Sequence, residues 1–293
     1  MISILLIAGC LGPEGGADYQ EQWMVLGINS DSSLLDVRFA SSNSGMLAGQ
    51  GHVRLDWVPL QEGNLGYARQ ALLPDMSVED SGIQVGPDSL QKDADQWVLK
   101  IQSGELDSRI QVENLILEPQ SSTTDGWRMD ALFAGPMQGV LRAESRSNLI
   151  KGYAVGVRAW GNSPPSLQGQ TRRSAFVLGE DLAIGIDQRG SQATAFAVIA
   201  GQQLDASTAI LRKDASGYIM DFQPATDLEV RLMPRRPHRQ TNPWDHLYAI
   251  ERWVAGLRYG HPVHRIRAAD AQIRLGDRQL KSRAIISVND FSQ

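Results

Sequence analysis

Short runs of alternating apolar and polar residues, separated by turn residues, constrain the fold of this chain more than any other feature. Residues 97–102 (Trp-Val-Leu-Lys-Ile-Gln) and 110–113 (Ile-Gln-Val-Glu) follow this pattern, as half-buried strands do. Turn residues recur about every ten positions, a spacing typical of sandwiches and barrels and not of parallel sheets with crossover helices. The chain is therefore predicted to be all-β.

Two hairpins are predicted in the C-terminal third of the chain. Residues 209–211 and 218–222 flank the turn sequence Asp-Ala-Ser-Gly at 214–217. Further on, 272–275 and 279–281 flank a Gly-Asp turn. Apolar strand residues on both sides of Gly- and Asp-containing turns are the usual signature of an antiparallel hairpin.

One segment departs from this pattern and predicts a helix at about 243–259. Pro243 follows a capping residue and would take the first helical position. Apolar residues then recur at helical spacing: Leu247, Ile250, Val254 and Leu257. This stripe is expected to pack against a sheet. The alternative is a pair of strands, because Trp, Tyr and Val also suit strands.

Length and composition set outer limits on the kind of protein. A chain of 293 residues allows two domains or one large one. Apolar residues make up 42% and charged residues 21%, as in a globular protein with an apolar core. The net charge of −5 argues against a nucleic-acid partner.

The sequence predicts no cofactor and no metal site. No Gly-rich phosphate loop follows a predicted strand, and no Gly-x-Ser-x-Gly elbow occurs. His261 and His264 are three positions apart but straddle Pro262, and on an extended segment they would point to opposite faces. We expect these histidines to be solvated or hydrogen-bonded.

The only cysteine, Cys10, is a candidate site for lipid attachment. Residues 7–10 (Ile-Ala-Gly-Cys) resemble the lipobox of bacterial lipoproteins, after a short apolar run that no basic residue precedes. Two or more acyl chains would anchor the protein stably. We therefore expect residues 1–17 to be signal and tether, and the protein to lie in the bacterial envelope, at the outer membrane more than the inner, since no Asp follows Cys10. The alternative is a short apolar strand with a chance cysteine.

Residues 149–161 are the most suggestive segment for a binding site. Their glycines, inside a strand-like run, indicate close backbone approach or a bulge. Tyr153, Arg158 and Trp160 are the candidate ligand-binding residues. If Arg158 faces a cavity, its buried charge needs a carboxylate partner, for which Asp187 and Glu251 are the candidates.

Three segments resemble lipocalin-like double-barrel proteins of the carotenoid 1,2-hydratase (hydroxyneurosporene synthase) type. Gly152, Trp160 and Gly161 match the central motif of that group, and residues 176–184 and 259–265 resemble two later ones. Val157 and Arg158 stand where the group has an Asp-His pair. The resemblance implies two lipocalin-like β-barrel or sandwich domains around an apolar cavity. It also implies that the acid–base pair is lost.

The predicted domains are an N-terminal β-domain at 18–145 and a C-terminal β-domain, carrying the helix, at 146–293. We expect an envelope lipoprotein that binds or carries an apolar small molecule or lipid, and that contacts the membrane through Cys10. The first alternative is a hydratase or isomerase acting on an isoprenoid or lipid-like substrate, with Arg158, Asp187, Tyr153 and Glu251 as candidate catalytic residues. The second alternative is a structural component of the envelope. The missing nucleophiles favour binding over catalysis.

Overall fold

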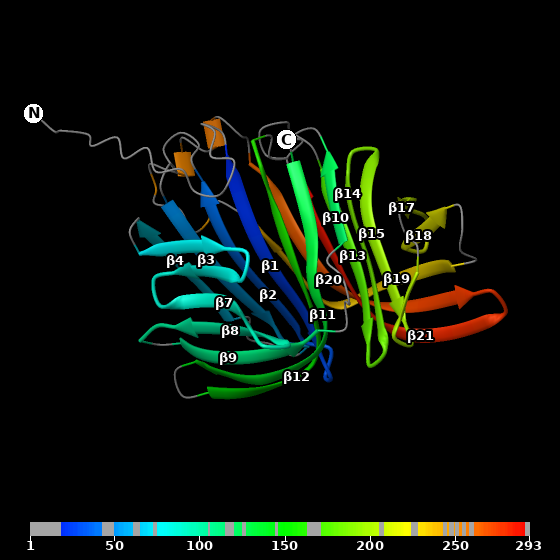
Figure 1. The fold of residues 1–293 in the computed structure, drawn as a ribbon, viewed down its shortest axis with the longest axis horizontal. Helices are drawn as coiled ribbons and strands as arrows, with labels where there is room; N and C mark the ends of the chain where they lie inside the picture. The colour runs from blue at the N-terminus through cyan, green and yellow to red at the C-terminus, as the bar shows by residue number, and fades with distance from the viewer. Residues whose placement is uncertain are drawn as a thin grey trace, which may run out of the picture.

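The computed structural model describes most of the chain, as strands joined by turns. The described residues are 19–42, 50–60, 65–72, 75–104, 106–114, 120–124, 127–143, 146–162, 171–204, 208–223, 228–242, 245, 249, 252–253, 256–257 and 261–290. Within these ranges no helix is long and apolar enough to cross a membrane. The strands form two curled antiparallel sheets that lie side by side (Figure 1). The all-β prediction is confirmed.

The first sheet of the described residues has twelve strands. The first described strand lies beside two long strands near the middle of this sheet. In order across the sheet, the strands are β4 (Leu65–Leu72), β3 (Gln50–Val58), β2 (Leu34–Ser42), β1 (Gln20–Asn29), β12 (Arg146–Gly161), β11 (Trp127–Ala143), β9 (Leu106–Glu113), β8 (Gln96–Gln102), β7 (Asp88–Asp93), β6 (Gly82–Val85) and β5 (Met76–Glu79), with β10 (Gln120–Thr124) also paired to β11. We call the body formed by this sheet the first barrel.

The second sheet has nine strands and forms the second barrel. In order across the sheet, the strands are β16 (Gln202–Leu204), β15 (Gln192–Ile199), β14 (Leu182–Arg189), β13 (Arg172–Gly179), β21 (Arg278–Asp290), β20 (Val263–Leu275), β19 (Leu228–Thr241), β18 (Tyr218–Gln223) and β17 (Thr208–Lys213). The two predicted hairpins are confirmed as β17–β18 and β20–β21.

Side chains of β1 alternate between two apolar cores, because successive residues of a strand point to opposite faces. Trp23 and Val25 pack inside the first barrel. Met24 and Leu26 pack instead against the second sheet, in a core shared with Phe176 and other residues of β13–β21. A third core fills the second barrel. Burial on both faces explains why β1 is almost continuously apolar.

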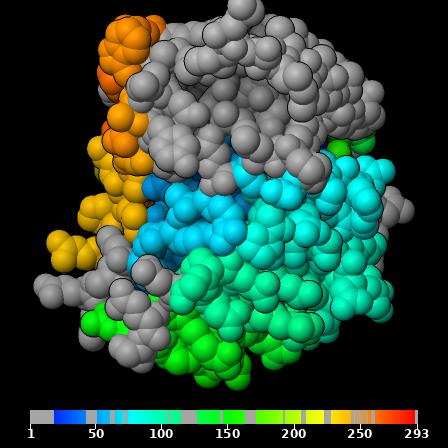
Figure 2. Space-filling model, turned by 90° about the vertical axis from the view of Figure 1, so that its left-hand side faces the viewer, coloured from blue at the N-terminus to red at the C-terminus, as the bar shows by residue number. Residues whose placement is uncertain are grey.

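Polar side chains close the first barrel across its seam. Tyr67 on β4 donates a hydrogen bond of 2.9 Å to Asp88 on β7, and Arg69 lies 3.1 Å from the same carboxylate. Burial, together with the neighbouring Asp88 carboxylate, raises the pKa of Tyr67 to about 12, so its hydroxyl stays a donor. Figure 2 faces the side of this barrel formed by the strands coloured cyan to green, with β19 in yellow at its margin. Arg239 of β19 reaches Asp56 of β3 at 2.8 Å, which ties the second sheet to the first.

The change of sheet does not coincide with the predicted domain boundary at 145/146. Strand β12 hydrogen-bonds to β1 and β11, so the chain leaves the first sheet only after Gly161 and enters the second at Arg172. The division into domains stays a prediction.

The segment predicted as a helix, 243–259, is described at six positions. Asp245 lies in a turn. The other five positions are helical: Ala249, Arg252, Trp253, Gly256 and Leu257. Leu257 is 70% exposed, so the predicted packing of this stripe against the sheet is wrong at that position. The remaining positions, including Glu251, lie outside the described residues, as do residues 1–17 with Cys10.

Candidate functional site

The inner face of the first barrel carries a buried ion pair near the end where β1 begins. In the β1–β12 ladder Trp23 pairs with Arg158 and Glu21 with Trp160. Since Trp23 faces the core of the barrel, alternation places the other three on the same face. The sequence alone predicted only that Arg158 would need a carboxylate; the register of these two strands supplies it.

Glu21 is that carboxylate, and it accepts three hydrogen bonds. Arg158 Nε donates to Glu21 Oε1 at 2.7 Å, and Trp23 Nε1 donates to the same oxygen at 2.7 Å. Tyr19 Oη donates to Oε2 at 2.7 Å. Glu21 is 1% exposed and Arg158 5% exposed. Such a pair is tolerated in an apolar core only because its polar atoms are satisfied.

Two tryptophans flank the guanidinium group of Arg158. Its central carbon lies 4.9 Å from the centroid of the Trp23 ring and 4.3 Å from that of Trp160. Arg128 approaches Trp160 at 5.0 Å. Cation–π contacts of this kind are strongest where water is excluded, and they fix the plane of the guanidinium group.

The outer side of the cluster is close to solvent. Arg158 Nη1 donates to Asp80 Oδ1 at 2.9 Å, and the side chain of Asp80 is 99% exposed. Burial by itself would lower the pKa of Arg158, but the charges of Glu21 and the hydrogen bond to Asp80 outweigh it, and the pKa lies above its ordinary value. Arg158 is therefore a permanent cation whose outer nitrogen contacts one exposed carboxylate.

A buried hydroxyl lies beside the ion pair. Ser41 on β2 is the ladder partner of Glu21 and is 1% exposed. Its hydroxyl has no hydrogen-bond partner among the residues that the structure describes. A buried polar group without a partner costs free energy, so this hydroxyl is positioned to receive a polar group from a bound molecule.

The other residues predicted from the sequence lie elsewhere. Asp187 pairs with Arg172 at 2.9 Å and with Ser174, between the two sheets. Asp187 is therefore not the partner of Arg158. Tyr153 packs against the core between the sheets and so faces away from Arg158. Glu251 lies outside the described residues. Of the predicted ligand-binding residues, only Arg158 and Trp160 meet in one cluster.

His264 is occupied by a second polar network between the sheets. It lies 2.8 Å from Asp36 and 3.3 Å, through Nδ1, from Arg38. Arg38 also donates to Asn289 and Ser287 of β21. Burial and the Arg38 charge hold the pKa of His264 below its usual value, and Arg38 and His264 hold that of Asp36 low in spite of burial. The network joins the sheets and has its hydrogen bonds satisfied.

Sequence reasoning missed Tyr19, Glu21, Trp23 and Asp80. A signal was present for the first three, because Tyr19-x-Glu21-x-Trp23 places a carboxylate between two aromatic donors on one face of a strand. Asp80 carried no signal, since its contact depends on the fold bringing a distant turn to the barrel mouth.

No protein-family model and no curated protein matches the sequence. Solved structures do match in fold. CghA with Sch210972 aligns with a TM-score of 0.68 at 8% identity, over 94% of this chain and 89% of CghA. A putative AttH from Nitrosomonas europaea aligns at 0.62 and 10% identity, over 93% and 92%. Kievitone hydratase from Nectria haematococca aligns at 0.57 and 10% identity, over 97% and 92%.

At these identities the comparisons establish the fold alone. The chain has the lipocalin-like fold of two β bodies shared with CghA and kievitone hydratase. The general resemblance predicted from the sequence is confirmed at the level of fold.

Proposed function

We propose that this protein is a hydratase or isomerase that acts on an apolar substrate carrying an oxygen function, within the first barrel. The observation that carries the proposal is the Glu21–Arg158 pair, held between Trp23 and Trp160 on an otherwise apolar inner face. A carboxylate and a permanent cation that meet in one buried site can act as a base and as a stabiliser of developing negative charge.

In the proposed binding mode, the substrate replaces the carboxylate of Asp80 as the partner of Arg158. A carbonyl or carboxylate oxygen of the substrate takes the place of Asp80 at Arg158 Nη1, and the substrate's apolar body lies along the inner face of the barrel. Ser41 donates its unpartnered hydroxyl to the substrate. Burial makes each of these contacts stronger than it would be in water.

The proposed chemistry uses the two charges in separate roles. In isomerisation, Glu21 takes a proton from the γ-carbon of the enone and returns it to the α-carbon, which moves the double bond, while Tyr19 and Trp23 hold its carboxylate in place. In hydration, Glu21 takes a proton from water as the water oxygen adds to the β-carbon, and then gives that proton to the α-carbon. In both reactions Arg158 stabilises the negative charge that develops on the carbonyl oxygen.

The likeness to kievitone hydratase favours this class over a carrier, because that protein's name states a hydration activity on the same fold. In this proposal Glu21 is the base, whereas Arg158 stays protonated and exchanges no proton. The loss of the Asp-His pair stays a prediction. The lipid anchor at Cys10 and the envelope location stay predictions beside this proposal.

Turnover of a mixture of conjugated carbonyl compounds tests the proposal. Purified protein is incubated with long-chain enones. The products are separated by liquid chromatography, which resolves isomers of equal mass, and identified by mass spectrometry, which detects the gain of one water. We expect conversion by the native protein and a loss of about 100-fold or more in Glu21→Gln, which keeps the acceptor for Trp23 but not the base. Arg142→Gln, an exposed arginine on β11, is the matched control and should convert normally. Binding without conversion by the native protein would contradict catalysis and favour a carrier.

A further inference from the structure

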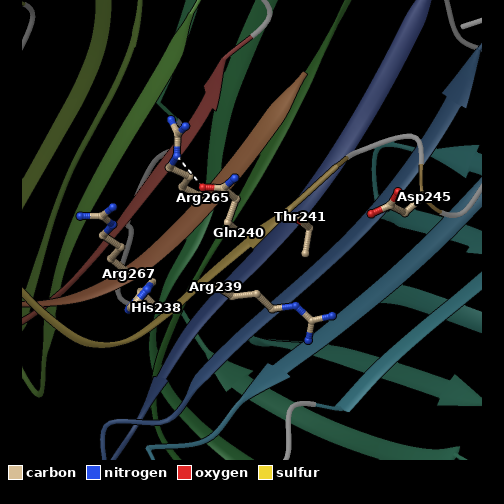
Figure 3. Close-up of a pocket in the computed structure, with 7 residues that line it drawn as sticks. All are labelled: His238, Arg239, Gln240, Thr241, Asp245, Arg265 and Arg267. Atoms are coloured by element: carbon tan, nitrogen blue, oxygen red, sulfur yellow. Dashed lines mark hydrogen bonds between the residues drawn. The ribbon is translucent and has the colours of Figure 1, made fainter. Parts of the chain in front are cut away.

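Two pockets adjoin at the rim of the second barrel and share two arginines. The first, of about 510 Å³, lies over the ends of β19 and β20 (Figure 3). The second, of about 610 Å³, lies over the β17–β18 turn and β21. Arg265 and Arg267 line both. They point to the same face of β20 as Ala269 and Ala271, which belong to the core of the second barrel.

The first pocket is strongly cationic. Arg239, Arg265 and Arg267 line it with His238, and Asp245 is the acid among the described residues that line it. Arg239 has a partner in Asp56, whereas Arg265 donates at 3.1 Å to the neutral side chain of Gln240. Figure 3 shows Arg265 and Arg267 two positions apart on β20, with Asp245 at the opposite side of the view.

A neutral donor also borders this pocket, from the other face of β19, since Thr241 is the ladder partner of His264 and not of Arg265 or Arg267. The Thr241 hydroxyl, which belongs to the lining, has no hydrogen-bond partner in the part of the chain that the structure describes. Among the described residues, the ion pairs that join the two sheets involve Arg239 but neither Arg265 nor Arg267. These two arginines therefore bring positive charge to a pocket whose described lining holds one acid, Asp245.

The second pocket has an apolar wall beside the shared arginines. Tyr218, Pro234, Ile286 and Val288 line it, together with the charged side chains of Lys213 and Asp214. Ile286 belongs to the apolar core of the second barrel. A molecule lying across both pockets would meet charge at one end and aliphatic surface at the other.

We propose that this rim binds the carboxylate of a small amphipathic molecule. The carboxylate lies against Arg265 and Arg267, whose planar guanidinium groups match its geometry, and the aliphatic chain runs along Ile286 and Val288. This site lies on the second barrel, away from Arg158, and does not depend on the function proposed for the first.

Calorimetric titration with octanoate, octanol and acetate tests the site. Octanoate should bind, octanol should bind at least about tenfold more weakly because it lacks the charge, and acetate should bind more weakly because it lacks the chain. The double variant Arg265→Gln/Arg267→Gln should lose at least about tenfold in octanoate affinity. Arg274→Gln is the matched control, since Arg274 lies on the same strand but on its other face, paired with Glu229.

Three results would overturn the proposal. The first is equal binding of octanoate and octanol, and the second is octanoate affinity unchanged in the double variant. The third is an affinity that falls only when Glu21 and Arg158 are replaced, which would place the octanoate in the first barrel. Circular dichroism of each variant verifies that the sheets remain folded.

Discussion

The two barrels share one architecture but hold their charges in different places. In the core of the first barrel, the ring centroid of Trp97 lies 6.1 Å from that of Trp23 and 5.1 Å from that of Phe133. A buried ion pair lies at one end of this core. The core of the second consists mostly of aliphatic side chains, many of them alanine. Its cations lie at the rim, around Arg265 and Arg267. This difference is the basis for proposing a reaction centre in the first barrel and a binding site for a charged end in the second.

The largest effect should come from breaking the buried pair of the first barrel. Replacing Glu21 by Ala leaves Arg158 buried without its main carboxylate, and should lower the free energy of unfolding by about 3–5 kcal/mol. Urea denaturation followed by tryptophan fluorescence measures this loss. The double variant Glu21→Gln/Arg158→Met removes both charges and should recover at least about 2 kcal/mol. A loss below about 1 kcal/mol in the single variant would mean that the pair is not buried as described.

Two glycines that lie against aromatic rings test how tightly the first barrel and the space between the sheets are packed. A Cβ at Gly156 would overlap Phe133 in the first barrel, and one at Gly185 would overlap Phe196 between the sheets. Each glycine-to-alanine change should therefore cost about 1–3 kcal/mol through overpacking. Thermal unfolding measures both. A neutral result at Gly156 alone would show that the first barrel has room for the ring to move, and a neutral result at both would contradict the packing described here.

The sheet interface should respond to pH through His264. Because the pKa of His264 is lowered below 6.5 in the folded protein, the unfolded chain binds more protons below that pH. Stability should therefore fall as the pH drops below 6.5, by up to about 1.4 kcal/mol per pH unit. Asp36, whose pKa is also lowered, stays ionised in this window, and its contribution is lost as the pH falls below 3.8 toward the lowered pKa. Urea denaturation at several pH values should give a shallower slope in His264→Gln; an unchanged slope would assign the effect to another group.

The smallest effect is expected at the surface of the first barrel. Arg142 and Asp107 form a 3.2 Å ion pair with both side chains more than half exposed. Arg142→Ala should change the free energy of unfolding by no more than about 1 kcal/mol. A larger loss, measured by urea denaturation, would show that exposed pairs on this sheet contribute more than their solvent screening allows, and would weaken the contrast with Glu21.

The sequence predicted the strands better than it predicted the site. The alternation of apolar and polar residues, together with the turn residues, predicted the all-β class and both hairpins, because these signals are local. Arg158 could be recognised as a charge in need of a partner, but Glu21 lies 137 positions away, and only the β1–β12 register brings them together. Asp187 has the right chemistry and yet pairs with Arg172, because it lies on a different sheet. Long-range register is not encoded in any short motif, so the pairing of the charges could not be read from the residues alone.

Photolabelling with an apolar enone that carries a diazirine tests the central claim most directly. Peptide mapping after irradiation identifies the strands that contact the bound probe. Labels are expected on inner-face positions of β1, β2 and β12, near Arg158 and Ser41. Labelling should be reduced in Glu21→Gln/Arg158→Met and by excess unlabelled enone. Labels confined to the second barrel or to the outer surface, or unaffected by the double variant, would contradict it.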